Sequence, residues 1–465
     1  MIDLLGQRVL KKGLVSRNEL AQAIKRQQLF GGRLGFNLIA LNLISESDLS
    51  DFLTFTPHTP KKLDETNLET GFITDLILKH CIFLKKFNIT DLSNKIKLPS
   101  SLILEIVTEL RSDRFIEVAR GDISLAASEY ALTDAGINRA IQCLEECRYS
   151  GPAPVSLEEY RYAIGIQTIK SIEIAEDHLK HVFSQIVLND DKLKTLGSAI
   201  NSTKPIFLYG SPGNGKTTIA ELIGDSLPDE VYIPHAVLAG DQVIVVYDQV
   251  NHRTINQKDD DNHLDQRWIK IKRPVVIAGG ELTLNTLDLN FNTDSKYYEA
   301  PLQMKANNGL FIVDDFGRQI VDPQTLLNRW IIPLDRQTDF LTLHTGMKFE
   351  IPFDQLVIFA TNLPPKKIAD DAFLRRLRYK IRVDYPTKNE YLKIFKKICD
   401  SNSIQFDKEV YIHLMHKYAS SKRNLSCCDP RDLIDQIIDL AGFEKKPPVL
   451  TKAFLDKAWE NYFVF

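Results

Sequence analysis

The sequence predicts a multidomain α/β protein in which an α/β core is preceded by two small units and followed by a helical tail. The 465 residues exceed what one hydrophobic core usually organises. From about residue 160, apolar strand-like runs alternate with helix-like segments until the helical pattern of the tail begins. Proline-containing breaks at 56–62 and 149–155 separate the core from the segments before it.

We expect these breaks to set the domain boundaries. The two prolines of the first break suit a semi-extended linker, because proline disfavours helix at the residue before it. The predicted domains are 1–56, 68–148, 149–385 and 386–465, with a linker at 57–67.

The composition is that of a globular protein, with 44% hydrophobic and 26% charged residues. The net charge of −3 gives no overall attraction to nucleic acid or anionic membranes. The six cysteines lack the spacing of a metal site, so we interpret them as reduced core residues. The sequence does not begin with a basic and apolar leader, and no apolar run approaches the ~20 residues that cross a bilayer. We therefore expect a cytoplasmic protein without a membrane span.

Residues 1–56 contain an internal repeat with a spacing of 29 residues. Each copy begins with a Leu-Gly pair, continues through a short apolar helix and a turn, and ends in a second helix. The matching pairs are Leu5-Gly6 with Leu34-Gly35, Val9-Leu10 with Leu38-Ile39, and Leu14-Val15 with Leu43-Ile44. The pattern predicts two stacked helix–turn–helix units.

At these residues the segment resembles the N-terminal domain of type IV pilus and type II secretion assembly ATPases, which in some members binds cyclic di-GMP through tandem motifs. The second copy keeps the Arg-Leu-Gly opening, and the first copy keeps the turn glycine and the closing Gln. The resemblance implies that cyclic di-GMP is a regulatory ligand, bound by residues of both copies. These residues are Leu5, Gly6, Arg8, Gly13, Leu14, Gln27, Arg33, Leu34, Gly35 and Leu43.

Three positions depart from that pattern. Leu4 stands where the first Arg would be, Asn42 replaces the second Gly, and Thr56 replaces the second Gln. Arg33 can stack on a guanine or pair with a phosphate through its fork of N–H groups. Arg8, one helical turn after Leu4, is the candidate to replace the missing arginine. The competing interpretation is a degenerate docking domain that binds no dinucleotide.

Residues 68–148 show the order of elements that is typical of a winged helix. Three helices, a two-stranded ribbon and a further helix are expected, at 71–86, 90–95, 100–111, 115–119, 129–133 and 134–146. The third helix and its end, residues 100–114, carry three acidic and two basic residues, which disfavours DNA binding. We interpret this unit as a protein-interaction or spacer module.

A glycine-rich loop at 210–217 follows the apolar run 204–209 and precedes the helix-forming run 218–225. Small residues allow backbone N–H groups to surround phosphates, and a lysine reaches the β- and γ-phosphate oxygens. Lys216 takes that role, and the Thr217 hydroxyl is a Mg²⁺ ligand. The predicted ATP-binding residues are Gly210, Ser211, Pro212, Gly213, Asn214, Gly215, Lys216, Thr217 and Thr218. The loop therefore predicts a nucleoside-triphosphate site.

Two later strands end in polar residues that complete such a site. The apolar run 309–313 precedes Asp314 and Asp315, and the run 355–361 precedes Asn362. Asp314 would complete the Mg²⁺ shell, Asp315 would polarise the attacking water, and Asn362 would orient that water. These strand ends predict hydrolysis of the triphosphate.

Together with these segments, the Ala-Phe-Leu-Arg-Arg-Leu run at 372–377 and the Asp-Pro-Arg run at 429–431 resemble the AAA+ ATPase superfamily over roughly residues 160–465. The resemblance implies an AAA+ P-loop NTPase core with a helical lid, Mg²⁺-dependent hydrolysis of ATP, and a homo-oligomeric ring such as a hexamer. It also implies that Arg375 or Arg376 reaches the next subunit's γ-phosphate, while Arg431 acts within its own subunit. We therefore interpret the chain as a ring-forming remodelling ATPase with an unidentified protein client and cyclic di-GMP as its regulator.

The carboxylate pair departs from the family, which usually has Asp-Glu where this chain has Asp314 and Asp315. The shorter side chain withdraws the base by about one methylene, and a misplacement of ~1 Å can lower a rate about 100-fold. Two alternatives stay open: a nucleotide-gated adaptor with little hydrolysis, and a nucleic-acid motor or loader that acts through residues 68–148.

The segment between the loop and the carboxylate strand is expected to contain a hairpin at 236–254 and a core strand at 274–278. Tyr297 and Tyr298 fall where AAA+ rings line their pore. We interpret them either as pore residues that grip a polypeptide or as residues packed in an interface.

Overall fold

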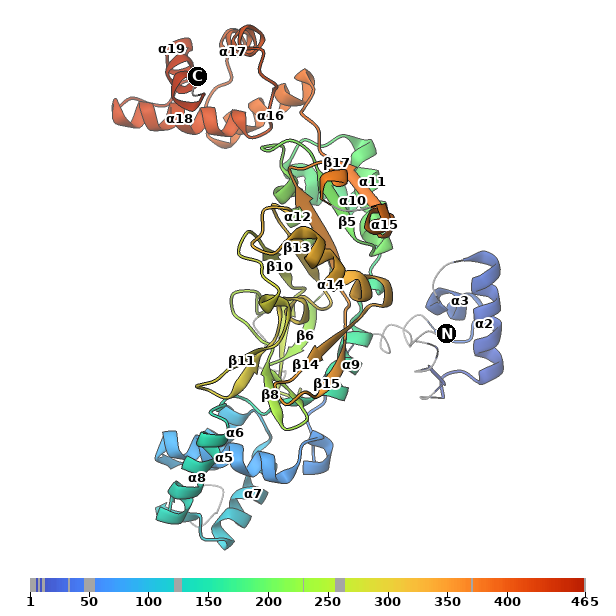
Figure 1. Cartoon of the computed structure of the whole chain (residues 1–465), viewed down its shortest axis with the longest axis vertical. Helices are drawn as coiled ribbons and strands as arrows, with labels where there is room; N and C mark the ends of the chain where they lie inside the picture. The colour runs from blue at the N-terminus through green and yellow to red at the C-terminus, as the bar shows by residue number, and fades with distance from the viewer. Residues whose placement is uncertain are drawn as a thin grey trace.

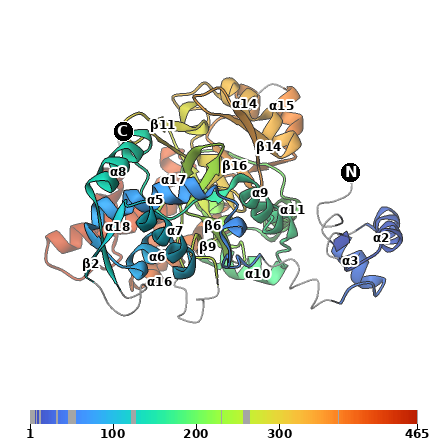
Figure 2. The ribbon, with the colours of Figure 1, turned by 90° about the horizontal axis from the view of Figure 1, so that it is seen from below.

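The chain folds into an elongated body with a helical unit beside it (Figure 1). Four C-terminal helices stand at one end of the body, the α/β core occupies the middle, and residues 68–148 form the other end. The view from below also shows α2 and α3 to the side of the body (Figure 2). The computed structural model describes residues 6, 9–10, 13–31, 34–45, 55–120, 128–228, 230–255, 264–368 and 371–463, without the side chains of 371 and 372. No helix within these ranges combines the length and the apolar character that a bilayer span requires.

The core is a five-stranded parallel sheet whose strand order differs from the order in the chain. Across the sheet the strands are β10 (Val275–Ala278), β13 (Leu310–Val313), β16 (Leu356–Thr361), β5 (Ile206–Tyr209) and β17 (Tyr379–Arg382). The three central strands are apolar and almost entirely buried, as expected for a sheet covered on both faces. Because the strands are parallel, the carboxyl ends of β5, β16 and β13 meet at one edge of the sheet.

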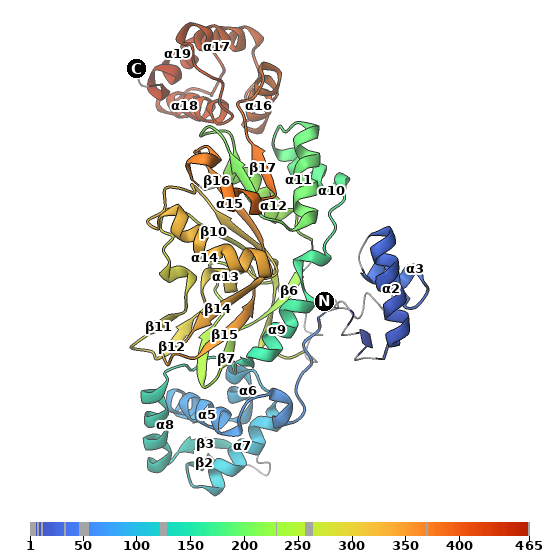
Figure 3. The ribbon, with the colours of Figure 1, turned by 45° about the vertical axis from the view of Figure 1, so that its right-hand side comes forward.

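Helices cover both faces of this sheet (Figure 3). On one face, α11 (Asp190–Ser202) and α12 (Lys216–Asp225) share a core with Ile206 of β5. On the other face, α14 (Pro323–Arg336) shares a core with Phe207. Neighbouring strand residues face opposite sides of a sheet, so the apolar run of β5 supplies both cores. The core strand predicted at 274–278 is confirmed as β10, at the edge of the sheet.

A second, mixed sheet is built largely from the segment between α12 and β13. Its strands, in order, are β11 (Asn290–Asn292), β12 (Tyr297–Glu299), β8 (Gln242–Val245), β7 (Ala236–Ala239) and β4 (Val155–Ser156). The pairs β6 (Glu230–Pro234) with β9 (Trp268–Lys272) and β14 (Thr338–Thr342) with β15 (Lys348–Pro352) lie outside this sheet. Strands β7 and β8 form the predicted hairpin, and its turn uses Gly240, whose φ of 58° suits glycine.

Tyr297 and Tyr298 lie on β12, where Tyr298 is buried and Tyr297 is half-buried. Tyr298 is only 1% exposed, and its hydroxyl hydrogen-bonds with His344. The ring of Tyr297 lies 5.7 Å from that of Tyr149, centroid to centroid. The pore interpretation is therefore wrong for Tyr298, because a side chain packed inside its own subunit cannot grip a polypeptide.

Residues 68–148 contain the predicted helices and ribbon. The helices are α5 (Thr70–Leu84), α6 (Ile89–Ile96), α7 (Ser100–Ser112) and α8 (Asp134–Glu146), and the antiparallel strands are β1 (Lys86–Phe87), β3 (Glu129–Leu132) and β2 (Ile116–Arg120) in that order. The core of this unit, with Ile77 and Ile106, continues into Ala236 and Val243 of the second sheet. The unit is therefore packed against the α/β body.

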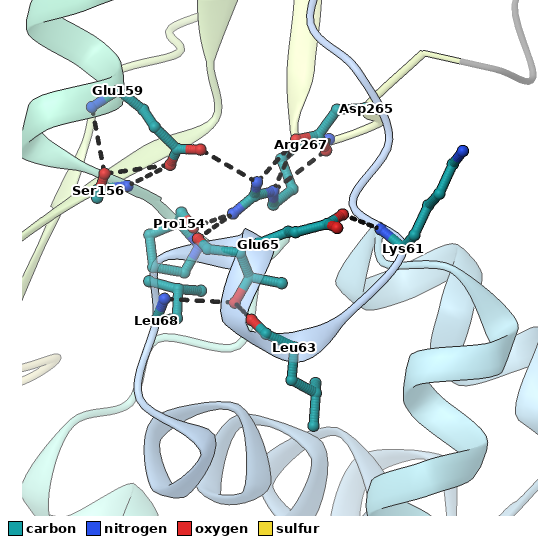
Figure 4. Close-up of polar contacts among 10 residues, drawn as sticks. Lys61, Leu63, Glu65, Leu68, Pro154, Ser156, Glu159, Asp265 and Arg267 are labelled. Atoms are coloured by element: carbon teal, nitrogen blue, oxygen red, sulfur yellow. Dashed lines mark hydrogen bonds and ion pairs between the residues drawn. The ribbon is translucent and has the colours of Figure 1, made fainter.

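The predicted linker and the break before the core are both fixed to the body through a buried arginine (Figure 4). Arg267 is 1% exposed and pairs with Asp265 at 2.8 Å. Its Nη1 donates to the carbonyl oxygens of Thr66, at 3.1 Å, and Pro154, at 3.3 Å. Residues 63–66 form a short 3₁₀ helix. The predicted linker, residues 57–67, is thus docked against the body by a contact between residues far apart in the chain, and we call it the strap.

The C-terminal helical unit consists of four helices with their own core. They are α16 (Lys388–Ser401), α17 (Lys408–Ser421), α18 (Asp429–Phe443) and α19 (Lys452–Tyr462). The side chains of Thr387, Asp407 and Thr451 cap the N-termini of α16, α17 and α19. The packed core includes Tyr391, Phe395, Tyr418, Leu433 and Trp459.

The N-terminal unit contains α2 (Arg17–Phe30) and α3 (Leu34–Ala40) around a small apolar core. The predicted turns at equivalent positions of the two copies are present, at Gly13 with a φ of 70° and at Asn42 with a φ of 52°. Both values lie in the left-handed region, which glycine and asparagine tolerate best.

Candidate functional site

The glycine-rich loop joins β5 to α12 at the carboxyl edge of the central sheet. Gly213 and Gly215 have φ angles of 76° and 82°, which explains why glycine occupies these positions. A Cβ on Gly210 would lie 2.1 Å from the carbonyl oxygen of Val383, so this position also has no room for a side chain. Gly215 directly precedes α12, whose first N–H groups therefore face the loop. The loop has the geometry of a phosphate-binding site.

Lys216 lies inside this loop with 8% of its surface exposed. Its Nζ donates to the carbonyl oxygens of Gly210, at 3.1 Å, and Ser211, at 2.9 Å. Burial lowers the pKa of the ammonium group, while the carboxylates of Asp315 and Asp314 oppose that shift. The lysine is therefore held at the loop beside two carboxylates.

The Thr217 hydroxyl lies against the carboxylate of Asp314, at 3.0 Å from Oδ1 and 2.9 Å from Oδ2. One residue comes from the start of α12 and the other follows the end of β13. A hydroxyl and a carboxylate at one point are hard oxygen donors of the kind that Mg²⁺ prefers. The two predicted metal ligands are thus brought together.

Asp315 and Asn362 meet at the same edge. Asn362 Nδ2 donates to Asp315 Oδ1 at 2.9 Å, and Asp315 has a φ of 48°. Among the described residues, Asn362 Oδ1 is buried without a hydrogen-bond partner. An orphaned buried acceptor beside a carboxylate is a position where a water molecule would be bound. The pair therefore fits the predicted role of holding an attacking water.

A residue that sequence reasoning missed stabilises the turn after the carboxylates. Gln319 Nε2 donates to the carbonyl oxygen of Asp314 at 2.7 Å, and Gln319 Oε1 accepts from the N–H of Gly317 at 2.8 Å. On the other side, the Thr361 hydroxyl donates to the carbonyl oxygen of Phe316 at 2.6 Å. These bonds fix the backbone that presents Asp315. The signal in the sequence was only a glutamine near a glycine, which is too common to identify a role.

The C-terminal helical unit touches the glycine-rich loop directly. The N–H of Cys428 donates to the carbonyl oxygen of Gly213 at 2.9 Å, and the Ser426 hydroxyl donates to the same oxygen at 3.1 Å. The N–H of Cys427 donates to Asn214 Oδ1 at 3.3 Å. The two adjacent cysteines were interpreted from sequence as core residues; in the structure they join α18 to the loop.

A cavity of about 470 Å³ lies between the loop and the C-terminal helical unit. Its polar wall includes 212–218 with Asp314, Asp315 and Asn362, and its apolar wall includes Ile186 and Ile398. This volume is within the ~300–1,000 Å³ range of small-molecule sites. A larger cavity of about 1520 Å³ lies beside β9 and β10, and among the described residues it contains none of the predicted ATP-binding ones.

The predicted arginines are placed differently. Arg431 lines the cavity and its Nε pairs with Asp432 at 3.2 Å. Arg376 pairs with Asp335 at 3.0 Å, whereas Arg375 is exposed. In the described part of the chain neither Arg375 nor Arg376 lines this cavity.

The predicted cyclic di-GMP residues are only partly described. Leu5, Arg8 and Arg33 lie outside the described residues. Gly6, Leu34 and Gly35 are buried in the unit, Gln27 and Leu43 are half-buried, and Gly13 and Leu14 are exposed. Leu34 belongs to the apolar core of the unit.

Residues 387–461 match a family described as a domain of unknown function (DUF8689), and no curated protein matches the sequence. The structure of NtrX from Brucella abortus aligns with a TM-score of 0.37 and 12% identity over 61% of this chain and 57% of that chain. Two variants of RuvB from Thermotoga maritima align with TM-scores of 0.34 at 12% and 11% identity, over 62% and 63% of this chain and 70% and 72% of theirs. At these scores the similarity identifies neither a function nor a substrate for this chain.

Proposed function

We propose that this chain is a Mg²⁺-dependent ATPase of the AAA+ superfamily. The observation that carries the proposal is the convergence of Lys216, Thr217, Asp314, Asp315 and Asn362 at one edge of the sheet. The strands that precede them in the chain, β5, β13 and β16, lie side by side in the sheet although they are far apart in the sequence. A chance glycine-rich turn would not collect a lysine, a hydroxyl, two carboxylates and an orphaned acceptor around one cavity.

Each of these residues has its own role in the hydrolysis of ATP. With ATP in the loop, Lys216 donates to β- and γ-phosphate oxygens instead of to the loop carbonyls. Thr217 and Asp314 would hold Mg²⁺, which would supply charge neutralisation at the phosphates. Asn362 orients a water through its Oδ1, and Asp315 accepts a proton from that water as it attacks the γ-phosphorus. The bond between the β- and γ-phosphates breaks, and ADP and phosphate leave.

Arg375 is the better candidate for an arginine that acts on the next subunit of a ring. It is exposed, whereas the guanidinium of Arg376 is already paired with Asp335. An exposed arginine at the end of α15 (Asp371–Arg376) is available to a neighbouring copy. Arg431, in the cavity wall, acts in its own subunit. On this proposal, residues 386–465 are a lid over the nucleotide.

The regulatory part of the proposal concerns the N-terminal unit. Its two-copy arrangement and left-handed turns support a tandem-motif receptor for cyclic di-GMP, with Arg33 and Arg8 as the candidate polar contacts. The winged-helix order of residues 68–148 and their packing against the body support a spacer that connects a protein client to the ATPase. The acidic third helix gives no support to a nucleic-acid motor.

A second candidate function is a nucleotide-gated adaptor with little turnover. The short side chain of Asp315 favours this second function. Its carboxylate already accepts a hydrogen bond from Asn362 Nδ2 at 2.9 Å. A base that is badly placed slows proton transfer from the water, whereas nucleotide binding depends on the glycine-rich loop and Lys216.

The experiment that tests the nucleotide site compares Lys216→Ala with Lys204→Ala, an exposed lysine at the start of the strand-like run. We expect Lys216→Ala to abolish ATP binding in a fluorescence titration and Lys204→Ala to bind as the wild type does. Equal binding by both variants would contradict the site assignment.

A further inference from the structure

The side chain of Arg431 is oriented by a chain of contacts that ends on the last helix. Its Nε donates to Asp432 Oδ1 at 3.2 Å. The other carboxylate oxygen, Asp432 Oδ2, accepts from the Tyr462 hydroxyl at 2.7 Å. Tyr462 is the final residue of α19, so a residue from a separate helix fixes the acid that holds the arginine.

The first turn of α18, which carries Arg431, is itself anchored by a buried polar network. Asp429 is 5% exposed, and its Oδ2 accepts from the Tyr418 hydroxyl at 2.6 Å and from the N–H of Ser426 at 3.1 Å. The hydroxyls of Tyr418 and Tyr391 lie 3.0 Å apart. The same turn donates to the glycine-rich loop through the N–H of Cys428. The backbone that carries Arg431 is therefore fixed both by the Asp429 network and by the glycine-rich loop.

The side chain of Arg431 is less restrained than its backbone. The Arg431 side chain is 65% exposed, and an unrestrained arginine samples many rotamers, which carry ~2 kcal/mol of entropy. The Nε bond to Asp432 uses one of the five guanidinium N–H donors. An acid that is itself held by Tyr462 reduces the rotamers of Arg431 while leaving its terminal nitrogens for a phosphate.

We propose that Asp432 and Tyr462 are positioning residues that orient Arg431 toward the γ-phosphate of bound ATP. This inference rests on the proposed ATPase function and assigns a role to the end of α19. In the part of the chain that the structure describes, neither residue lines the cavity, so each acts through Arg431. The closure of the lid and the pose of its arginine are then linked, since α18 and α19 must be packed together for the chain of contacts to form.

The test compares Tyr462→Phe with Tyr411→Phe in the full-length protein. Both changes remove one hydroxyl from the same helical unit. The Tyr462 hydroxyl lies 2.7 Å from Asp432 Oδ2 and 3.4 Å from Asp429 Oδ1, whereas among the described residues the Tyr411 hydroxyl donates one long bond, of 3.4 Å, to the carbonyl oxygen of Lys388. We expect Tyr462→Phe to lower kcat about three- to tenfold with little change in KM or in the affinity for ATP. Tyr411→Phe should keep the wild-type kcat. Asp432→Asn, which keeps the size of the side chain, should lower kcat at least as much as Tyr462→Phe.

A double-variant cycle separates positioning from a structural effect. If Tyr462 acts through Arg431, then Tyr462→Phe has no further effect on kcat in a protein that already carries Arg431→Ala. A further loss of the same factor in that background, or an equal loss in Tyr411→Phe, would overturn the proposal. ATP binding is measured in parallel by fluorescence titration. A wild-type chain that neither binds nor hydrolyses ATP overturns the proposed function and this inference together, whereas normal turnover in Tyr462→Phe overturns this inference alone.

Discussion

The hydroxyl of Thr217 lies 2.9 Å from the carboxylate of Asp314, although 97 residues separate the two positions in the chain. Thr217 follows β5 and Asp314 follows β13, and β16 lies between these two strands in the sheet. The contact therefore joins the ends of two strands that are not neighbours. A hydroxyl and a carboxylate placed in this way would supply two of the oxygen ligands of an octahedral Mg²⁺ shell.

Asp314→Asn should therefore separate metal-dependent hydrolysis from nucleotide binding. The amide keeps the size of the side chain but removes the negative charge on which Mg²⁺ depends. We expect the Mg²⁺-dependent rate of ATP hydrolysis to fall about 100-fold, with the protein still folded. A matched control is Asp225→Asn, at the exposed end of α12. A Mg²⁺ titration that is the same for Asp314→Asn and wild type would contradict the assigned ligand.

Arg267→Met should destabilise the body far more than a surface replacement. The change leaves Asp265, which is 3% exposed, as a buried charge without its partner, and it removes the donor to the carbonyl oxygens of Thr66 and Pro154. Breaking a buried pair in this way costs ~3–5 kcal/mol. Thermal unfolding is the measurement, with Arg253→Met at an exposed position as the control.

Neutralising Asp265 should recover part of the stability that Arg267→Met loses. Adding Asp265→Asn to Arg267→Met removes the uncompensated charge, so the double variant should be more stable than Arg267→Met alone. If the strap were held by apolar packing only, the double variant would be no more stable, and Arg267→Met would unfold close to the wild-type temperature.

The stability of the second sheet should fall as the solution is acidified. Burial, together with the nearby positive charge of Lys97, lowers the pKa of His235 from its ordinary value of 6.5 to about 4. Between these two values the unfolded chain binds a proton that the folded chain does not, so stability is present above pH 6.5 and is lost as pH falls toward 4.

His235→Phe should remove much of this pH dependence, because phenylalanine keeps the aromatic contact with Tyr247 and carries no proton. We expect the free energy of unfolding of the wild type to decrease by about 2 kcal/mol from pH 7 to pH 4.5 relative to this variant. His416→Phe, at an exposed position, should retain the wild-type dependence. If the free energy of unfolding depends on pH in the same way in all three proteins, groups other than His235 cause the loss of stability in acid.

Much of the candidate nucleotide site could be predicted from the sequence because its residues occur in short continuous runs. The glycine-rich loop with Lys216 and Thr217 is a local pattern, and Asp314, Asp315 and Asn362 follow apolar strands directly. In a parallel sheet, polar residues at strand ends meet at one edge, so their convergence follows from the order of strands and helices.

The rest depended on contacts that no local pattern encodes. Ser426 and Gly213 are 213 residues apart, and a serine beside two cysteines has no distinctive chemistry in a sequence. Arg267 joins the strap to the core through backbone carbonyls, which every residue possesses. From its position along the chain, Tyr298 could be a pore residue or a residue packed in an interface, and the sequence alone did not show that it is buried on β12.

The most direct measurement is the release of phosphate from ATP, with Mg²⁺, by the wild-type chain and by Asp315→Asn, with ATP binding measured in the same samples. The amide keeps the hydrogen bond to Asn362 within reach but cannot accept a proton from water. The account predicts steady phosphate release by the wild type, and in Asp315→Asn binding within about twofold but release about 100-fold slower. Tight ATP binding without phosphate release by the wild type, or equal release by both proteins, would contradict the assignment of this chain as an ATPase with Asp315 as its base.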